Sequence, residues 1–387
     1  MFANGRWSCT ESARDHVSDY PIVDVDSHFM EPADFWAEHL EPMFAARAPV
    51  GDADRGGATI DGDRRFPTVQ WRSRAGANLS TLNEMWARDY GKYDERGWDA
   101  EAYVMACGDQ GIDQMVLYPS RGLMQVAAWG LDPVLAAAIV RAYNDWAAKF
   151  VAAAPERLLA VGQLDLRDVD RAVAEARRAV EQHGFKAFFV LPEPPLPGVT
   201  LERAYYEPLW SVLEELDVAL ALHNVAGTGL GQIGADRFGQ WALPRVAAAF
   251  PLESQLTLFS FLVGGICDRH PALRVVVLES GAGWLPFWLW WLDELYERYE
   301  GLDCDSLSMP PSDLFRRQCF ISAEMEEPTV GAVVDALGAD CIVTASDFPH
   351  PEGTFPNGVR EFAERDDLTD ATKRAILSDN PKRLYRL

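Results

Sequence analysis

The chain has 387 residues, of which 48% are hydrophobic and 24% are charged, and its formal net charge is −24 at pH 7. This composition is typical of a globular protein with a large core. So acidic a chain excludes nucleic acids and anionic membranes as the expected partners, because both attract basic residues. Six scattered cysteines without a CxxC pair indicate reduced thiols. With no run of about 18 apolar residues and no apolar N-terminal segment, we expect a cytoplasmic protein.

Eight short runs are too apolar to have one face in water, which is typical of buried parallel strands. In chain order they are Ile22–His28, Asp113–Pro119, Leu158–Leu166, Phe185–Pro192, Val218–Asn224, Leu273–Ser280, Cys319–Met325 and Cys341–Pro349. Helical patterns fill the intervals, at Pro133–Val151, Asp168–Gln182, Tyr205–Glu215, Glu253–Arg269, Trp284–Glu300, Pro328–Leu337, Val359–Arg365 and Asp370–Ser378. This alternation predicts an α/β fold, a (β/α)8 TIM barrel. A doubly wound open sheet is the alternative, but a glycine-rich loop usually follows its first strand.

A long insertion follows the first predicted strand and includes a stretch rich in Gly, Asp and Arg, Gly51–Arg65. Segments that follow a barrel strand lie on the face that carries active sites. We therefore expect a single metal-dependent barrel domain over residues 1–387, in which residues 29–98 form a cap or lid after strand one.

Polar side chains lie at the carboxyl ends of several predicted strands, where the side chains of a barrel share one cavity. Asp26 and His28 are two apart on the first strand, so they point to the same face. His223, Glu279 and Asp347 end the fifth, sixth and eighth strands. Other candidates near strand ends are Glu31, Glu324 and His350. A single polar residue at a strand end is usually a cap, but this coincidence of Asp, His and Glu predicts a metal site.

Five segments carry a resemblance to a known family: DVDSHFMEPADFW (Asp24–Trp36), HNVAGTG (His223–Gly229), DRHPALRVVVLESGAGWLP (Asp268–Pro286), TASDFPHPEG (Thr344–Gly353) and ILSDNPKRLYRL (Ile376–Leu387). In these segments the chain resembles the amidohydrolase superfamily, in the branch that includes aminocarboxymuconate-semialdehyde and resorcylate-type decarboxylases. The resemblance extends from about Ile22 to the C-terminus. It implies that Asp26, His28, His223 and Asp347 are metal ligands and that the protein forms a homo-oligomer.

The sixth strand departs from the pattern of that family. Its decarboxylases carry a catalytic histidine at the position where this chain has Glu279. A histidine can donate a proton near pH 7, whereas a carboxylate beside a metal ion is normally ionised and is a better ligand than acid. The departure weighs against the family's decarboxylation mechanism.

The candidate metal ligands are four carboxylates and three imidazoles: Asp26, His28, Glu31, His223, Glu279, Asp347 and His350. One divalent ion does not need so many ligands, and carboxylates can bridge two ions. The set suits two iron ions better than one zinc, with manganese or zinc as alternatives. Glu31 could instead orient His28, and His350 could hydrogen-bond within its loop.

Aromatic residues next to the candidate ligands predict an apolar mouth. We expect Trp36, Trp284, Trp288 and Glu324 to line the substrate pocket. The alternative is that the aromatic residues from Trp284 onward pack a helix against the barrel. An apolar mouth favours a bulky hydrophobic small molecule over a sugar or nucleotide.

Three functions compete on this basis. The ligand set favours a non-haem di-iron monooxygenase that hydroxylates a hydrophobic small molecule, such as a natural-product intermediate, with O₂ and an electron donor. Its catalytic residues would be Asp347, Glu279 and His350. The alternative is a metal-dependent hydrolase or decarboxylase that acts on an apolar carboxylate, ester or amide, with Asp347 as general base. A binding barrel without catalysis is the third.

Overall fold

The computed structural model describes residues 18–32, 35–52, 57–62, 64–65, 79–126, 130–193, 195–225, 233–239, 241–299, 301–302, 307–350 and 353–387. Its parallel strands are β1 (Val23–Phe29), β5 (Gln114–Pro119), β6 (Leu158–Ala160), β7 (Gly162–Gln163), β8 (Ala187–Val190), β9 (Ala219–Leu222), β10 (Arg274–Val277), β11 (Cys319–Glu324) and β12 (Ile342–Ala345). Three short strands, β2 (Val50–Asp52), β3 (Gly57–Ile60) and β4 (Arg64–Arg65), form a separate antiparallel sheet.

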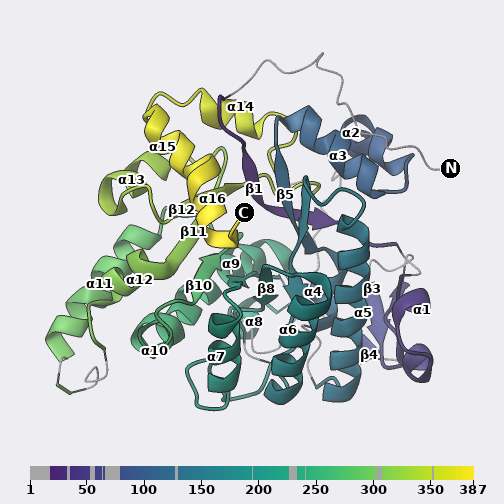
Figure 1. Cartoon of the computed structure of the whole chain (residues 1–387), viewed down its shortest axis with the longest axis horizontal. Coiled ribbons are helices and arrows are strands. Elements are labelled where there is room, and N and C mark those ends of the chain that lie inside the picture. The colour runs from purple at the N-terminus through teal and green to yellow at the C-terminus, as the bar shows by residue number, and fades with distance from the viewer. Residues whose placement is uncertain are drawn as a thin grey trace.

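Helices surround the parallel strands (Figure 1). The α-helices are α1 (Phe35–His39), α2 (Leu79–Asp94), α3 (Ala100–Gln110), α4 (Arg121–Val126), α5 (Pro133–Val151), α6 (Val169–His183), α7 (Glu207–Glu215), α8 (Ala235–Phe238), α9 (Ala242–Leu258), α10 (Ile266–Arg269), α11 (Leu285–Tyr299), α12 (Pro311–Gln318), α13 (Val330–Leu337), α14 (Gly358–Ala363), α15 (Asp370–Arg374) and α16 (Asn380–Tyr385). A 3₁₀ helix, η1 (Pro42–Arg47), and two π-helical turns, η2 (Phe259–Val263) and η3 (Ala375–Asp379), complete the described elements.

The parallel strands follow one another in the order that a closed eight-stranded ring requires. One sheet has the order β1-β5-β6 and the other β12-β11-β10-β9-β8-β7, and only Val161 separates β6 from β7 along the chain. At the opposite junction, an isolated parallel bridge joins Ser27 to Phe348. The predicted α/β fold and the eight predicted strand positions are confirmed, and the order does not reverse as it would in a doubly wound sheet.

Two clusters of buried side chains distinguish the inner and outer faces of the strands. Phe320 of β11 packs with Val276, Val343 and other residues of neighbouring strands, whereas Ile321 belongs to the cluster that the helices cover. Because successive residues on a strand point to opposite faces, Ser322 and Glu324 lie on the inner face with Phe320. The strand pattern therefore directs these polar side chains toward the interior.

Local signals explain where the helices begin and end. The Asp132 side chain accepts a hydrogen bond from Val134 N at the start of α5, and Asp168 does the same for Arg171 N at α6. Gly184 ends α6 with φ 70°, a conformation that glycine adopts at low cost. The predicted bounds of α5 and α6 agree with the structure to within a residue at each end.

The predicted helix Glu253–Arg269 differs most from the structure. Helix α9 begins earlier, at Ala242, continues through Pro251 and passes into η2 before α10. Proline removes one helical hydrogen bond, but Pro251 lies inside α9 and does not end it. The stretch Ala242–Val263 is long and apolar enough to cross a membrane by length and composition, a test that core helices also pass.

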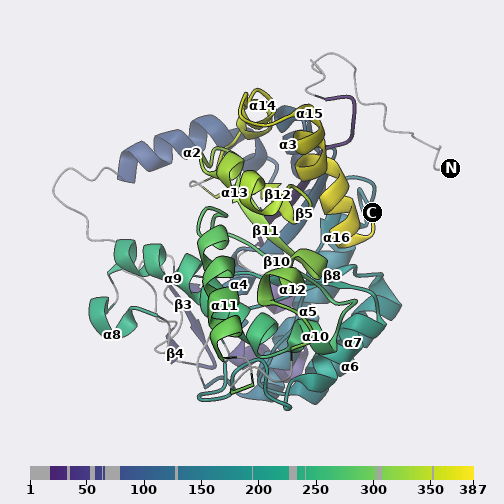
Figure 2. The same cartoon turned by 90° about the vertical axis from the view of Figure 1, so that its left-hand side faces the viewer.

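The segment between β1 and β5 contains the small antiparallel sheet and α2. The rings of Tyr90 and Tyr93 in α2 contact Phe348 and Phe355, which follow β12. Figure 2 shows α2 beside α3 and α14. The segment therefore packs next to the chain that follows a predicted ligand strand, and its role as a lid stays a prediction.

The junction of β6 and β7 leaves no room for a side chain at Gly162. A Cβ there would lie 2.5 Å from the ring of Phe188, which is fully buried. We expect Gly162→Ala to lower the free energy of unfolding by about 1–3 kcal/mol, the usual cost of overpacking, as measured by denaturant unfolding.

The matched control is Gly108→Ala in α3, where no atom lies within 4 Å of the added Cβ. This change should raise the free energy of unfolding by up to about 1 kcal/mol, since alanine favours helix over glycine. Equal stability of the Gly162→Ala variant and the unmutated protein would contradict the packing at this junction.

Candidate metal centre

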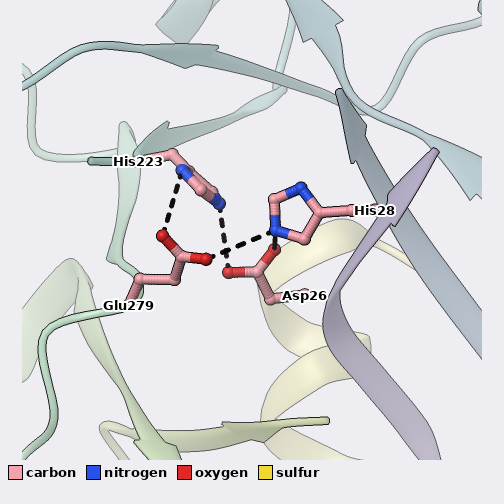
Figure 3. A group of neighbouring side chains, drawn as sticks. All are labelled: Asp26, His28, His223 and Glu279. Atoms are coloured by element: carbon pink, nitrogen blue, oxygen red, sulfur yellow. Dashed lines mark ion pairs between the residues drawn. The ribbon is translucent and has the colours of Figure 1, made fainter. Parts of the chain in front are cut away.

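Six of the seven predicted ligands converge beyond the carboxyl ends of the strands. Asp26 and His28 of β1 meet His223, which follows β9, and Glu279, which follows β10 (Figure 3). Their ligand atoms all lie within 4.8 Å of one another. A second group shares His28 and Glu279 and adds Asp347 and His350, which follow β12.

The separations between these atoms match those of ligands around one ion. The Nε2 atom of His28 lies 3.5 Å from Asp26 Oδ1, 3.4 Å from Glu279 Oε1 and 3.3 Å from Asp347 Oδ1. The Nε2 atom of His223 lies 3.4 Å from Asp26 Oδ2. Two atoms that each bind a tetrahedral ion at about 2.1 Å are about 3.4 Å apart.

Five buried ligand atoms have no hydrogen-bond partner within the described parts of the chain. They are Asp26 Oδ1, Asp26 Oδ2, His28 Nε2, His223 Nε2 and Asp347 Oδ1. Buried polar atoms almost always have partners, because an unsatisfied one costs free energy. Here the orphaned atoms are carboxylate oxygens and imidazole nitrogens that face one another, so a cation satisfies all of them. The arrangement is a divalent metal site.

Backbone carbonyls orient both imidazoles. The Nδ1 atom of His28 lies 2.9 Å from Pro119 O, and that of His223 lies 2.9 Å from Asn224 O. Because a carbonyl oxygen only accepts, each Nδ1 carries the proton and each Nε2 keeps its lone pair for a metal ion. The side chain of Asn224 donates to Ser254 Oγ at 2.8 Å, which fixes this loop on α9.

The buried carboxylates of the site favour a positive charge among them. Burial lowers the pKa of His28, but the carboxylates of Asp347, Glu279 and Asp26 outweigh burial and raise that pKa well above its usual value. Burial raises the pKa of Glu279, but His223, His28 and His350 outweigh it and hold that pKa well below its usual value. Buried carboxylates and protonated imidazoles stabilise one another here, and a divalent cation can take the place of the protons.

Two acidic residues of the site have backbone conformations that non-glycine residues rarely adopt. Glu279 has φ 47° and Asp347 has φ 55°. Each lies two residues beyond the end of its strand, β10 or β12. Such strain persists where surrounding contacts enforce it, and it clusters at functional sites.

Glu31 lies outside the cluster, which corrects its prediction as a metal ligand. Its carboxylate accepts hydrogen bonds from the backbone N–H groups of Ser120, Arg121 and Gly122, at 3.0–3.1 Å. These bonds satisfy its oxygens in the loop after β5. Glu31 also does not contact His28 directly, but it fixes the loop whose Pro119 carbonyl orients that ring.

His350 lies at the edge of the cluster. Its Nδ1 atom is 2.9 Å from Asp347 Oδ1, and its Nε2 atom is 3.1 Å from Ser120 Oγ. Its ring stacks on that of His28 with centroids 3.9 Å apart. His350 therefore belongs to the second candidate ligand group, and its hydrogen bond reaches the loop after β5, not a partner in its own loop; its role as a metal ligand stays a prediction.

The predicted pocket residues lie in different environments. Trp36 is buried against Phe35 in the core, at 4.1 Å between ring centroids, which corrects its assignment to the pocket. Trp288 packs edge-on against Phe259 at 5.0 Å, and the Trp284 Nε1 donates to Ser280 O. These contacts agree with the alternative interpretation, in which the aromatic residues from Trp284 onward pack a helix against the strands.

Glu324 lies on the inner face at the end of β11. Gly227–Gly229 lies outside the described residues.

Sequence reasoning missed Asp24, which lies two residues before Asp26 on β1 and connects this strand to the segment after β12. Its carboxylate accepts hydrogen bonds from Asp26 N, Ser27 Oγ and both the backbone N and the Oγ of Ser346. Burial raises the pKa of Asp24 to about 6 despite these bonds. An acidic residue in the middle of an apolar strand was the available signal.

Comparison with known proteins gives consistent matches over most of the chain. The family model described as "Amidohydrolase" matches residues 23–387. The γ-resorcylate decarboxylase of Rhizobium sp. (strain MTP-10005) is 28% identical over 298 residues, which cover 72% of this chain and 84% of that protein. The 2-amino-3-carboxymuconate-6-semialdehyde decarboxylase of Dictyostelium discoideum is 23% identical over 292 residues, 74% of this chain and 76% of its own.

Solved structures share the fold. An amidohydrolase from Mycobacterium avium subsp. paratuberculosis K-10 has a TM-score of 0.75 at 22% identity, covering 95% of this chain and 100% of its own. A 5-carboxyvanillate decarboxylase from Novosphingobium aromaticivorans DSM 12444, complexed with manganese, has a TM-score of 0.68 at 18% identity. The match covers 95% of this chain and 97% of the decarboxylase chain.

These relatives correct the prediction of a di-iron monooxygenase, and of an oxidoreductase in general. Both curated relatives are named as decarboxylases, and the structure with a named metal holds manganese. The prediction inferred two iron ions from a surplus of carboxylates. The structure reduces that surplus, because Glu31 binds backbone N–H groups and the two ligand groups share His28 and Glu279.

Removing a carboxylate from the cluster tests the metal site. We expect Asp26→Asn and Glu279→Gln each to weaken Mn²⁺ binding by at least about 10–100-fold, the loss that even an outer partner of a ligand causes. Isothermal titration calorimetry on metal-free protein measures the affinity, and circular dichroism verifies the fold.

The matched control is His270→Gln. His270 is also buried, but its ring contacts Glu214 and Glu207 at 3.0 and 2.8 Å, away from the cluster. Mn²⁺ affinity should not change in this variant. Wild-type affinity in Glu279→Gln would remove Glu279 from the ligand set.

Proposed function

The chain belongs to the amidohydrolase family, and on that premise we propose that it is a metal-dependent decarboxylase that removes CO₂ from an aromatic carboxylate without using O₂. The observation that carries the proposal is the group of five buried, unpartnered ligand atoms at the strand ends. The names of the curated relatives support the choice of decarboxylation over ester or amide hydrolysis.

One divalent ion, of which manganese is the best supported, accounts for the cluster. Asp26, His28, His223 and Asp347 would hold it, and Glu279 reaches the ligand atoms of both groups. When bound, the ion acts as a Lewis acid toward a substrate oxygen. Manganese accepts both carboxylate oxygens and imidazole nitrogens, which is the donor set present here.

The residues of the chain would bind the substrate and set the electrostatic environment of its carboxylate. Buried carboxylates disfavour the negative charge of the substrate carboxylate, and the loss of neutral CO₂ moves that charge to the ring carbon. His350 lies at the rim beside Ser120, where its N–H can donate to the substrate carboxylate.

Decarboxylase activity is measured directly. We expect the protein with Mn²⁺ to convert members of a panel of hydroxybenzoates into phenols, with one CO₂ released per substrate at equal rates in air and under argon. A chelator should abolish turnover, and added Mn²⁺ should restore it. Chromatography of the phenol and CO₂ trapping give the stoichiometry.

Asp26→Asn is the negative control, since it lacks a ligand oxygen. Substrate loss that stops under argon, or hydrolysis of esters and amides without CO₂ release, would contradict the proposal. Two metal ions per chain at saturation would contradict the single-ion assignment.

A further inference from the structure

We propose that Glu324 is the catalytic acid that delivers a proton to the ring carbon as CO₂ leaves. This assignment rests on the proposed decarboxylation and adds a residue that belongs to neither of the two ligand groups. It supplies an acid in a chain whose sixth strand ends in a carboxylate, Glu279, in place of a histidine.

The position of Glu324 follows from the strand register. Strand β11 lies between β10 and β12, Glu324 pairs with Ala345, and Ile321 pairs with both Val277 and Ile342. Asp347 lies two residues beyond Ala345, and Glu279 lies two residues beyond Val277. Glu324 therefore ends the middle one of three adjacent strands, and its two neighbours provide metal ligands at the same end.

The side chain of Glu324 points to the interior and has no partner there. Phe320, Ser322 and Glu324 alternate onto the inner face of β11, where Phe320 packs in the inner cluster. Among the described residues, neither a hydrogen bond nor an ion pair joins the carboxyl group of Glu324 to the protein. The hydroxyl of Ser322, 1% exposed, is also without a partner. This inner face therefore presents polar groups that a bound molecule can satisfy.

The surroundings of the Glu324 carboxyl group favour its protonated form. Burial raises the pKa of Glu324 well above its usual value, and the charges of Asp347, Glu279 and Asp26 raise it further. When neighbouring carboxyl groups have different pKa values, the one with the raised pKa can act as a proton donor while the others stay ionised.

The chemical step balances with this residue as the proton source. The bond between the ring carbon and the carboxylate carbon breaks, CO₂ departs, and the electron pair stays on the ring carbon. The Glu324 carboxyl group then transfers its proton to that carbon, which forms the C–H bond of the product and leaves Glu324 as a carboxylate. A proton from water restores the acid after the product leaves.

Glu324→Gln tests the assignment, because glutamine keeps the shape of the side chain and cannot supply the proton. We expect kcat to fall by at least about 100-fold, the lower range for loss of a general acid, with KM and Mn²⁺ affinity within threefold of wild type. Glu324→Asp should recover part of kcat. The wild-type protein should also exchange the ring hydrogen of the product in D₂O, as seen by proton NMR, and Glu324→Gln should not.

Glu175→Gln is the matched control, because Glu175 is a buried acid that bonds to Asn144 and Arg178 away from the cluster. Its kcat should equal that of wild type. Wild-type kcat in Glu324→Gln, or loss of Mn²⁺ from it, would overturn the assignment, as would loss of product exchange in His350→Asn with exchange retained in Glu324→Gln. If the unmutated protein releases no CO₂ from any substrate, the proposed function itself fails.

Discussion

The carboxylate of Asp24 joins two strands that lie at opposite ends of the chain. It accepts hydrogen bonds from the backbone and hydroxyl of Ser346, after β12, and from Ser27 on its own strand. The backbone adds Asp347 N to Asp26 O at 3.0 Å and His28 N to Phe348 O at 2.6 Å. Because Asp26, His28 and Asp347 are held by this one junction, the ring of strands and the metal site depend on the same contacts.

The three imidazoles of the site explain why Glu279 is tolerated at the position where the related decarboxylases carry a histidine. A carboxylate at this position adds a negative charge, and the imidazoles of His28, His223 and His350 lie close enough to stabilise it. The cost is that Glu279 is poorly suited to give a proton. Glu279 therefore adds an anionic donor to the candidate ligand groups, and the proposed reaction needs its acid from another residue, which is the reason to look at the neighbouring strand.

The strand positions and the convergence of polar side chains were predictable because both follow from local pattern. Apolar runs located the eight strands, and the rule that active sites lie at the carboxyl ends of barrel strands placed Asp26, His223 and Asp347 together; their role as metal ligands stays a prediction. The role of Glu31 was not predictable, because its partners are backbone N–H groups in a loop about ninety residues away. Nor does counting ligands reveal the number of ions, since atoms of His28 and Glu279 are shared by two groups.

Backbone conformation separates the two acids of the candidate ligand groups, Glu279 and Asp347, from Glu324, which belongs to neither group. Glu279 and Asp347 lie beyond their strands with positive φ, and their side chains turn across the open end toward the imidazoles. Glu324 is still part of β11 and paired with β12, so its side chain follows the strand alternation onto the inner face. Three adjacent strands thus carry three carboxyl groups of the same intrinsic chemistry. A difference of a few residues in where each strand ends places Glu279 and Asp347 in the candidate ligand groups and leaves Glu324 outside them.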